Sequence, residues 1–295
     1  MKFIAWIFVF FFLALSFPFD VFAERPEGSP NIIIFYVDDM GYADPSCFGN
    51  PDMETPHIDR FASEGLKLTN YYSNSPICSP SRVALNTGQA PGRHGVWAHF
   101  ASKKQNRERN MVDYLDPNVQ TMAKSFKGAG YATAHFGKWH IGSVQKESPT
   151  SPGGAGFDEW LSGLNFFDND PYLSRNGEYG QFKGPGSVIA MDATIEFLRK
   201  HVKGDKPIFA VTWFPSPHDP QSELPQGLPN AATLYNDEDT KKPGYFREIT
   251  LLDQQIGKLR KSLRQLGIAE NTLLFYCSDN GGLVAESSGG RAKKG

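Results

Sequence analysis

The stretch NIIIFYV at residues 31–37, followed at once by Asp38-Asp39, decides the fold of this chain. Its unbroken run of apolar and β-branched residues is typical of a strand that is buried on both faces of a parallel sheet. Similar apolar runs occur at residues 131–137, 207–214 and 271–277. Helical patterns separate the four runs, and such alternation favours an α/β fold. We therefore predict a mostly parallel mixed sheet sandwiched by helices.

The helical patterns are marked by caps, stops and apolar spacing. The clearest begins at Ile249 and repeats an apolar residue every three or four positions as far as Leu266, after which Gly267 ends it. Further helices are predicted to start at Thr55-Pro56, Pro80, Met122 and Val188. Residues 66–72 are predicted to form another strand. Residues 143–186 are rich in Gly, Pro, Ser and Asn, which indicates an irregular excursion over the sheet.

Polar residues follow each of the four predicted buried strands. They are Asp38-Asp39, then Lys138 with His140, then His218, and lastly Asp279-Asn280. Because ligands bind at the carboxyl ends of the strands in such sheets, we expect these side chains to lie together. Three carboxylates and one amide oxygen form an all-oxygen set that suits a hard cation such as Ca²⁺ or Mg²⁺.

A second informative stretch is Cys78-Ser79-Pro80-Ser81-Arg82, which continues to Leu85, Thr87-Gly88 and Pro91. It has the form C-x-P-S-R-x-x-L-x-T-G-x-x-P. Pro80 suits the first turn of a helix, which would place Cys78 at the helix N-terminus, where free N–H groups and the helix dipole favour an anion. The alternative is a buried, inert cysteine, which is the usual fate of a single Cys.

This motif resembles the signature of the type I sulfatases, arylsulfatase-like enzymes with the alkaline phosphatase superfamily fold. In that family the cysteine is oxidised after translation to Cα-formylglycine (3-oxoalanine), so the resemblance implies a formylglycine-generating maturase as a transient partner. It also implies hydrolysis of sulfate esters through a covalent sulfo-enzyme intermediate. The resemblance extends over nearly the whole mature chain, in the segments NIIIFYVDDMGYAD, TPHIDRFASEG, GYATAHFGKWHIG, PSPH and TLLFYCSDNGG.

The resemblance also implies a metal site. One Ca²⁺ would be held by the modified Cys78 together with four residues at the ends of the first and last predicted strands. These four are Asp38, Asp39, Asp279 and Asn280. A cation there would neutralise charge on the non-bridging oxygens of an anionic ester and would make a bound hydroxyl easier to deprotonate.

Five further residues receive catalytic roles from the resemblance. Arg82 would stabilise the aldehyde hydrate derived from the cysteine. Lys138 and His218 would contact the sulfate and the leaving oxygen, and a histidine is suited to donate a proton near neutral pH. His140 would orient the hydrate and act as the base in sulfate elimination. Lys294 resembles the family's second sulfate-binding lysine.

The N-terminus has the layout of a secretory signal peptide. Lys2 precedes an apolar run over residues 3–17, and Val21-Phe22-Ala23 provides small residues for cleavage before Glu24. The run is short for a membrane span, which needs about 20 residues, so an uncleaved membrane anchor is the weaker alternative. We expect residues 1–23 to be removed and the protein to be exported, either periplasmic or secreted.

Composition excludes one class of partner. The 30 basic and 32 acidic residues give a net charge of −2, whereas a nucleic-acid binder should show a clustered basic excess. The aromatic residues between Phe157 and Tyr172 could stack on sugar rings, and the segment 156–160 resembles that of sulfatases acting on hexosamine or galactose sulfates. A sulfated glycan or small molecule is therefore the expected substrate.

Two alternatives remain open at this stage. The same scaffold supports phosphate and phosphonate ester hydrolases. The family also continues past the position of Gly295 with a glycine-rich turn and a small C-terminal sheet, so residues 24–295 are expected to be a catalytic domain that is incomplete at its C-terminus. An inactive, truncated remnant is the second alternative.

Overall fold

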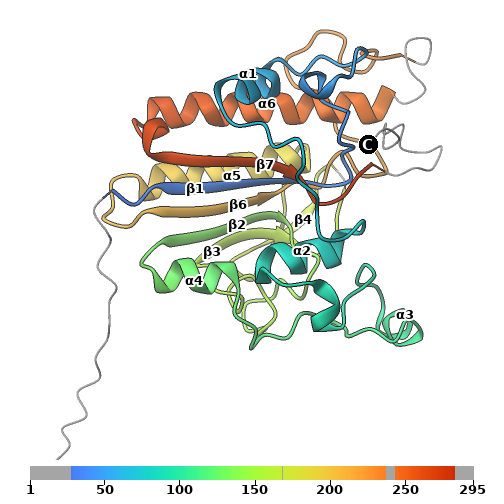
Figure 1. Cartoon of the computed structure of the whole chain (residues 1–295), viewed down its shortest axis with the longest axis vertical. Helices are drawn as coiled ribbons and strands as arrows, with labels where there is room; N and C mark the ends of the chain where they lie inside the picture. Colours follow the sequence, from blue (N-terminus) through green and yellow to red (C-terminus); the bar gives the residue numbers. More distant parts are fainter. Residues whose placement is uncertain (1–27, 168, 237–242, 283–295) are drawn as a thin grey trace, which may run out of the picture.

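A seven-stranded mixed sheet forms the centre of the computed structural model, which describes residues 28–167, 169–236 and 243–282 (Figure 1). The order is β5-β4-β3-β2-β6-β1-β7. The strands are β1 (Asn31–Val37), β2 (Ala132–Lys138), β3 (Glu159–Gly163), β4 (Tyr172–Arg175), β5 (Glu178–Gln181), β6 (Ile208–Trp213) and β7 (Thr272–Ser278). The five neighbouring strands β3, β2, β6, β1 and β7 pair in parallel. At the other edge of the sheet, β4 pairs antiparallel with both β3 and β5. The predicted α/β fold with a mostly parallel sheet is confirmed.

Helices cover both faces of the sheet (Figure 1). On one face α5 lies against β2 and β6, and α6 packs beside α5 and α1; on the other face α4 lies against β2 and α2 packs beside α4. The helices are α1 (Pro56–Glu64), α2 (Cys78–Thr87), α3 (Lys103–Glu108), α4 (Met122–Gly128), α5 (Gly186–His201) and α6 (Pro243–Gln265), with 3-10 turns η1 (Ser46–Phe48), η2 (Pro91–His94) and η3 (Ala269–Asn271). Among the described helices, none combines the length and apolar character that a bilayer crossing requires.

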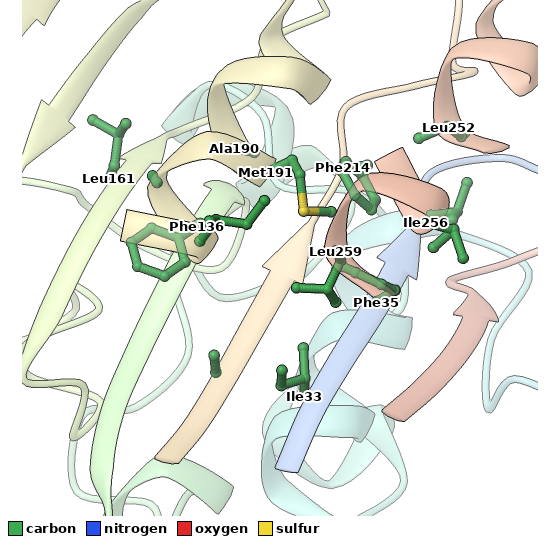
Figure 2. Close-up of a cluster of buried hydrophobic side chains, with 14 of the residues drawn as sticks. Ile33, Phe35, Phe136, Leu161, Ala190, Met191, Phe214, Leu252, Ile256 and Leu259 are labelled. Atoms are coloured by element: carbon green, nitrogen blue, oxygen red, sulfur yellow. The ribbon is translucent and has the colours of Figure 1, made fainter. Parts of the chain in front are cut away.

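The core is built in two layers because successive residues of β1 point to opposite faces. Ile33 and Phe35 pack against α5 and α6, as Figure 2 shows, where Met191 of α5 and Ile256 of α6 lie above the sheet. Ile34 and Tyr36 belong to the second layer, beneath α2 and α4. Burying each large aliphatic side chain contributes about 1.5–3 kcal/mol, so the two layers fix the strands that carry the polar residues at their ends.

The prediction of a strand at residues 66–72 is wrong. This segment is irregular, and Leu66 and Tyr72 are 85% and 82% exposed. A strand requires a neighbour for its backbone hydrogen bonds, and no described strand pairs with this segment or with the outer edge of β7. Its alternating pattern alone therefore does not produce a strand.

The interpretation of residues 143–186 as wholly irregular is also wrong, because this region contributes β3, β4 and β5. The turn between β4 and β5 is Asn176-Gly177, and both residues have positive φ, 52° and 97°. Asn-Gly between two short strands is a strong signal for a two-residue hairpin, so the sequence held a sign of this hairpin. β3 extends the parallel sheet through the buried residues Trp160 and Leu161.

Candidate active site

The polar residues that follow β1, β2, β6 and β7 meet at one edge of the sheet, as predicted. Asp38, at the end of β1, is fully buried and lies between two cations. Its Oδ1 accepts from Arg82 Nη2 at 3.1 Å, and its Oδ2 accepts from Lys138 Nζ at 2.5 Å. Burial opposes ionisation of Asp38, but Lys138 and then Arg82 outweigh it and hold the pKa of Asp38 well below its ordinary value.

Arg82 joins three of the four strand ends. It lies one turn into α2, is fully buried, and donates to Asp279 Oδ2 from Nε at 3.2 Å and from Nη2 at 2.9 Å. Its Nη1 donates to the backbone oxygen of Lys138 at 2.9 Å. The guanidinium carbon also lies 5.1 Å from the ring of Trp213 in β6, a favourable cation–π arrangement. One arginine therefore fixes the relative positions of β1, β2 and β7.

Asp39 and Asn280 complete the acidic cluster. Asp39 adopts a left-handed backbone conformation with φ of 61°, and its N–H donates to Asp279 Oδ1 at 3.2 Å. The Asn280 amide nitrogen donates to Asp39 Oδ1, and Asn280 Oδ1 is buried with no hydrogen-bond partner among the residues that the structure describes. A buried amide oxygen without a partner is costly unless a ligand satisfies it.

The three carboxylates could hold a cation. One oxygen from each of Asp38, Asp39 and Asp279 lies within 4.8 Å of the others, and Asp38, Cys78 and His218 form a second set of the same size. Burial, followed by the charge of Asp38, raises the pKa of both Asp39 and Asp279. Within the described ranges, Arg82 and Lys138 are thus the permanent cations that pair with this cluster of three carboxylates. The oxygen-rich set and the unpartnered amide oxygen of Asn280 fit a hard divalent cation.

Cys78 is the first residue of α2, as predicted, and is 7% exposed. Its Sγ lies 3.8 Å from Asp39 Oδ1. Burial, and then the charges of Asp38 and Asp279, raise the pKa of the Cys78 thiol far above its ordinary value. The thiolate is the nucleophilic form of cysteine, so the unmodified side chain is a poor nucleophile in this acidic pocket.

His218 is held against the cluster by a loop after β6. The backbone N–H of Asp38 donates to the oxygen of Ser216 at 3.2 Å, which ties this loop to the end of β1. His218 Nε2 lies 3.3 Å from Asp39 Oδ2, and its Nδ1 lies 2.5 Å from the oxygen of Asp219. Nδ1 donates to that oxygen, and Nε2 is the nitrogen that faces the cluster. When both nitrogens are protonated, the imidazolium can deliver a proton to the cluster from Nε2.

His140 follows β2 in a left-handed conformation, with φ of 53°. Its Nε2 lies 3.3 Å from the oxygen of Phe100, while its Nδ1 is buried and has no partner among the described residues. Burial, and then the charges of Lys138 and Arg82, lower the pKa of His140 well below its ordinary value. The neutral ring therefore donates from Nε2 and keeps a free lone pair at Nδ1. Lys294, the remaining predicted residue, lies outside the described residues.

Two side chains near the site, Phe167 and His99, were not among the predicted catalytic or metal-binding residues. Phe167 stacks on His218 with ring centroids 3.9 Å apart, and Lys138 Nζ lies 4.5 Å from the centroid of the same ring. His99 is adjacent to Phe100, whose oxygen contacts His140. The aromatic content of residues 143–186 was the only sequence signal for Phe167, and spacing along the chain gave none for His99.

Comparisons with known proteins identify the family of the chain. The family model described as Sulfatase matches residues 30–295. An ulvan-active sulfatase of Formosa agariphila is 30% identical over 86% of this chain and 51% of its own length. The human N-acetylgalactosamine-6-sulfatase is 29% identical over 85% and 50%. The solved structure of Ps i-CgsB in complex with k-i-k-neocarrahexaose is 25% identical, covers 90% of this chain and 62% of that chain, and has a TM-score of 0.77.

The chain thus spans about half the length of the curated relatives that it matches. The matched region includes every strand end that contributes to the site, from Asp38 to Asn280. The chain belongs to the sulfatase family.

Proposed function

We propose that this chain hydrolyses sulfate esters of a carbohydrate, with residue 78 in an oxidised form as the nucleophile. The observation that carries the proposal is the position of Cys78 Sγ, 3.8 Å from Asp39 in a cluster of three carboxylates and two cations. A thiol whose pKa is raised there has little use as a nucleophile. Oxidation of Cys78 to Cα-formylglycine would replace it with a group that this environment favours.

Two absent groups would supply part of the chemistry. A Ca²⁺ ion held by Asp38, Asp39, Asp279 and Asn280 would neutralise negative charge, and the hydrated aldehyde at position 78 would offer one hydroxyl to attack sulfur and another to release sulfate. Buried Arg82 keeps two of these carboxylates in place. Preorganised groups of this kind lower the cost of developing charge because they need not move during the reaction.

The remaining residues bind the ester and move protons. Lys138 Nζ, held between Asp38 and the ring of Phe167, provides a cation for a non-bridging sulfate oxygen. His218 Nε2 faces the cluster and is placed to donate a proton to the departing alcohol. His140, neutral and with a free lone pair at Nδ1, is placed to accept the proton when sulfate leaves.

The carbohydrate substrate rests on the relatives and on one contact. The names of the similar proteins refer to ulvan, N-acetylgalactosamine 6-sulfate and a neocarrahexaose complex. In this chain Phe167 lies against both His218 and Lys138, so an aromatic side chain borders the proposed sulfate position. A sulfated sugar is therefore the substrate class that we propose.

We also propose that the protein is exported to the periplasm or secreted, and that a formylglycine-generating enzyme acts on Cys78 as a transient partner. The support for export is the signal-like layout of residues 1–23. The support for the maturase is the complete Cys78–Arg82 motif together with the raised pKa of the unmodified thiol.

Calcium should stabilise the folded chain because the carboxylate cluster is built only in the folded state. At a calcium concentration one hundred times the dissociation constant, we expect about 2.7 kcal/mol of added stability, seen as a higher thermal midpoint. Asn280→Ala, which removes one oxygen ligand, should reduce this gain. Asp192→Asn, in an exposed pair with Lys258, should retain it. A midpoint that calcium does not change would refute the cation site.

Matched esters test the proposed reaction. We expect kcat/KM for 4-nitrophenyl sulfate to exceed that for 4-nitrophenyl phosphate by about a hundredfold or more, a difference of about 2.7 kcal/mol. The reason is that the sulfate ester carries one negative charge and the phosphate ester up to two beside a carboxylate cluster. Faster hydrolysis of the phosphate would favour the alternative phosphate ester hydrolase. A folded, formylglycine-containing chain that hydrolyses neither ester would favour the inactive alternative.

A further inference from the structure

The segment from Trp97 to Arg109 is a hydrogen-bonded unit beside the active site. Asn106, in α3, is almost fully buried and holds the unit together. Its Oδ1 accepts from the N–H of Ala101 at 3.0 Å, and its Nδ2 donates to Asp113 Oδ1 at 2.9 Å. Exposed Trp97 donates from Nε1 to the backbone oxygen of Arg109 at 3.0 Å. The positions of these side chains are therefore defined by the fold.

This unit is attached directly to the catalytic residues. The N–H of Phe100 donates to Ser79 Oγ at 3.0 Å, and the oxygen of Phe100 lies 3.3 Å from His140 Nε2. Ser79 is the residue after Cys78, and its hydroxyl donates to the backbone oxygen of His140 at 2.9 Å. His99, adjacent to Phe100, consequently lies at the border of the site.

His99 contacts Arg109 and lies within the electrostatic influence of Lys138 and His218. Burial, then the charges of Arg109, Lys138 and His218, lower the pKa of His99. Arg109 Nη1 donates to the backbone oxygen of His99 at 3.0 Å and lies 3.4 Å from His99 Nε2. In the neutral ring Nε2 accepts from Arg109, and Nδ1–H is left to donate.

Arg109 has unused binding capacity. A guanidinium has five N–H donors, and the contacts of Arg109 within the described part of the chain involve only Nη1. Among the same residues no carboxylate lies within ion-pairing distance of Arg109. A partly exposed arginine without an acidic partner, next to an exposed indole and a donor imidazole, is suited to a planar or tetrahedral anion on a sugar.

We propose that Arg109 and His99, beside Trp97, form a second anion subsite that binds a further sulfate or carboxylate group of the glycan whose sulfate ester is hydrolysed. The inference rests on the proposed function and names its substrate more narrowly as a glycan with at least two anionic groups. Trp97 provides an exposed aromatic face for a sugar ring, while Arg109 and His99 Nδ1 provide the donors for the anion.

The test compares two 6-O-sulfated sugars that differ in the group on the 2-nitrogen, an acetyl in one and a sulfate in the other. N-acetylglucosamine 6-sulfate and D-glucosamine 2-N,6-O-disulfate are titrated calorimetrically into the Cys78→Ala chain, which does not consume them. We expect the disulfate to bind about tenfold more tightly, the effect of one charge-assisted hydrogen bond, with the preference falling at higher salt. Arg109→Gln should abolish this preference. Arg107→Gln, an equal charge change at an exposed neighbour on α3, should leave it intact.

A preference that survives in Arg109→Gln, or no preference before substitution, would overturn the subsite. The same holds if neither sugar binds. The hydrolytic function is judged separately with 4-nitrophenyl sulfate, which carries only the scissile anion. Hydrolysis of that ester by the chain with intact Cys78, combined with any of these three results, means that only the subsite is wrong.

Discussion

Replacement of Cys78 by alanine lowers kcat/KM for 4-nitrophenyl sulfate by about 10⁴-fold or more, the size of effect expected when a nucleophile is removed. The fold should survive, because within the described part of the chain the Cys78 side chain makes one weak hydrogen bond, from Sγ to Asp39 Oδ1 at 3.8 Å. Initial rates give the loss of activity. Far-ultraviolet circular dichroism and the thermal midpoint show whether the variant is folded.

The matched control is Cys47→Ala. Cys47 is also a free cysteine but is half-buried within η1, where its N–H donates to Asp59 of α1. This variant should keep the activity of the unsubstituted chain. A Cys78→Ala protein that hydrolyses the ester within tenfold of the unsubstituted rate contradicts a nucleophile at position 78.

Arg82→Leu should destabilise the chain by about 3–5 kcal/mol, the cost of removing one partner from a buried ion pair. Arg82, Asp38 and Asp279 are all fully buried, so the substitution leaves two carboxylates with Lys138 as their nearest permanent cation. The substitution also removes the hydrogen bond from Arg82 Nη1 to the backbone oxygen of Lys138, which frees the end of β2. The measurement is the urea midpoint at constant calcium and pH.

Arg60→Leu is the control for this experiment, because Arg60 pairs with Glu64 on the exposed surface of α1. Its urea midpoint should stay close to that of the unsubstituted chain. A loss of less than about 1 kcal/mol in Arg82→Leu would contradict the view that this arginine fixes the site by joining three strands.

The site could be predicted in outline because a parallel sheet brings the carboxyl ends of its strands together. Asp38, Lys138, His218 and Asp279 are far apart in the chain, yet each follows a short, largely apolar run that is typical of a buried strand. Once the four runs are recognised, topology places their polar residues side by side. Pro80, which suits the first turn of a helix, likewise places Cys78 at the start of α2.

Other features depend on contacts that have no local pattern. β5 has the sequence EYGQ and lies at the sheet edge, so it lacks the apolar run by which the central strands were recognised. The strand predicted at residues 66–72 has a suitable pattern but no described strand beside it. The stacking of Phe167 on His218 and the pairing of Arg109 with His99 depend on tertiary structure alone.

Mass analysis of the tryptic peptide 68–82 tests the central claim most directly, because this peptide contains Cys78 as its only cysteine. The protein is produced with a formylglycine-generating enzyme and assayed for sulfate ester hydrolysis before digestion. We predict that residue 78 has exchanged its sulfur and two hydrogens for one oxygen, in proportion to the activity. An active preparation in which Cys78 remains entirely a thiol would contradict the account.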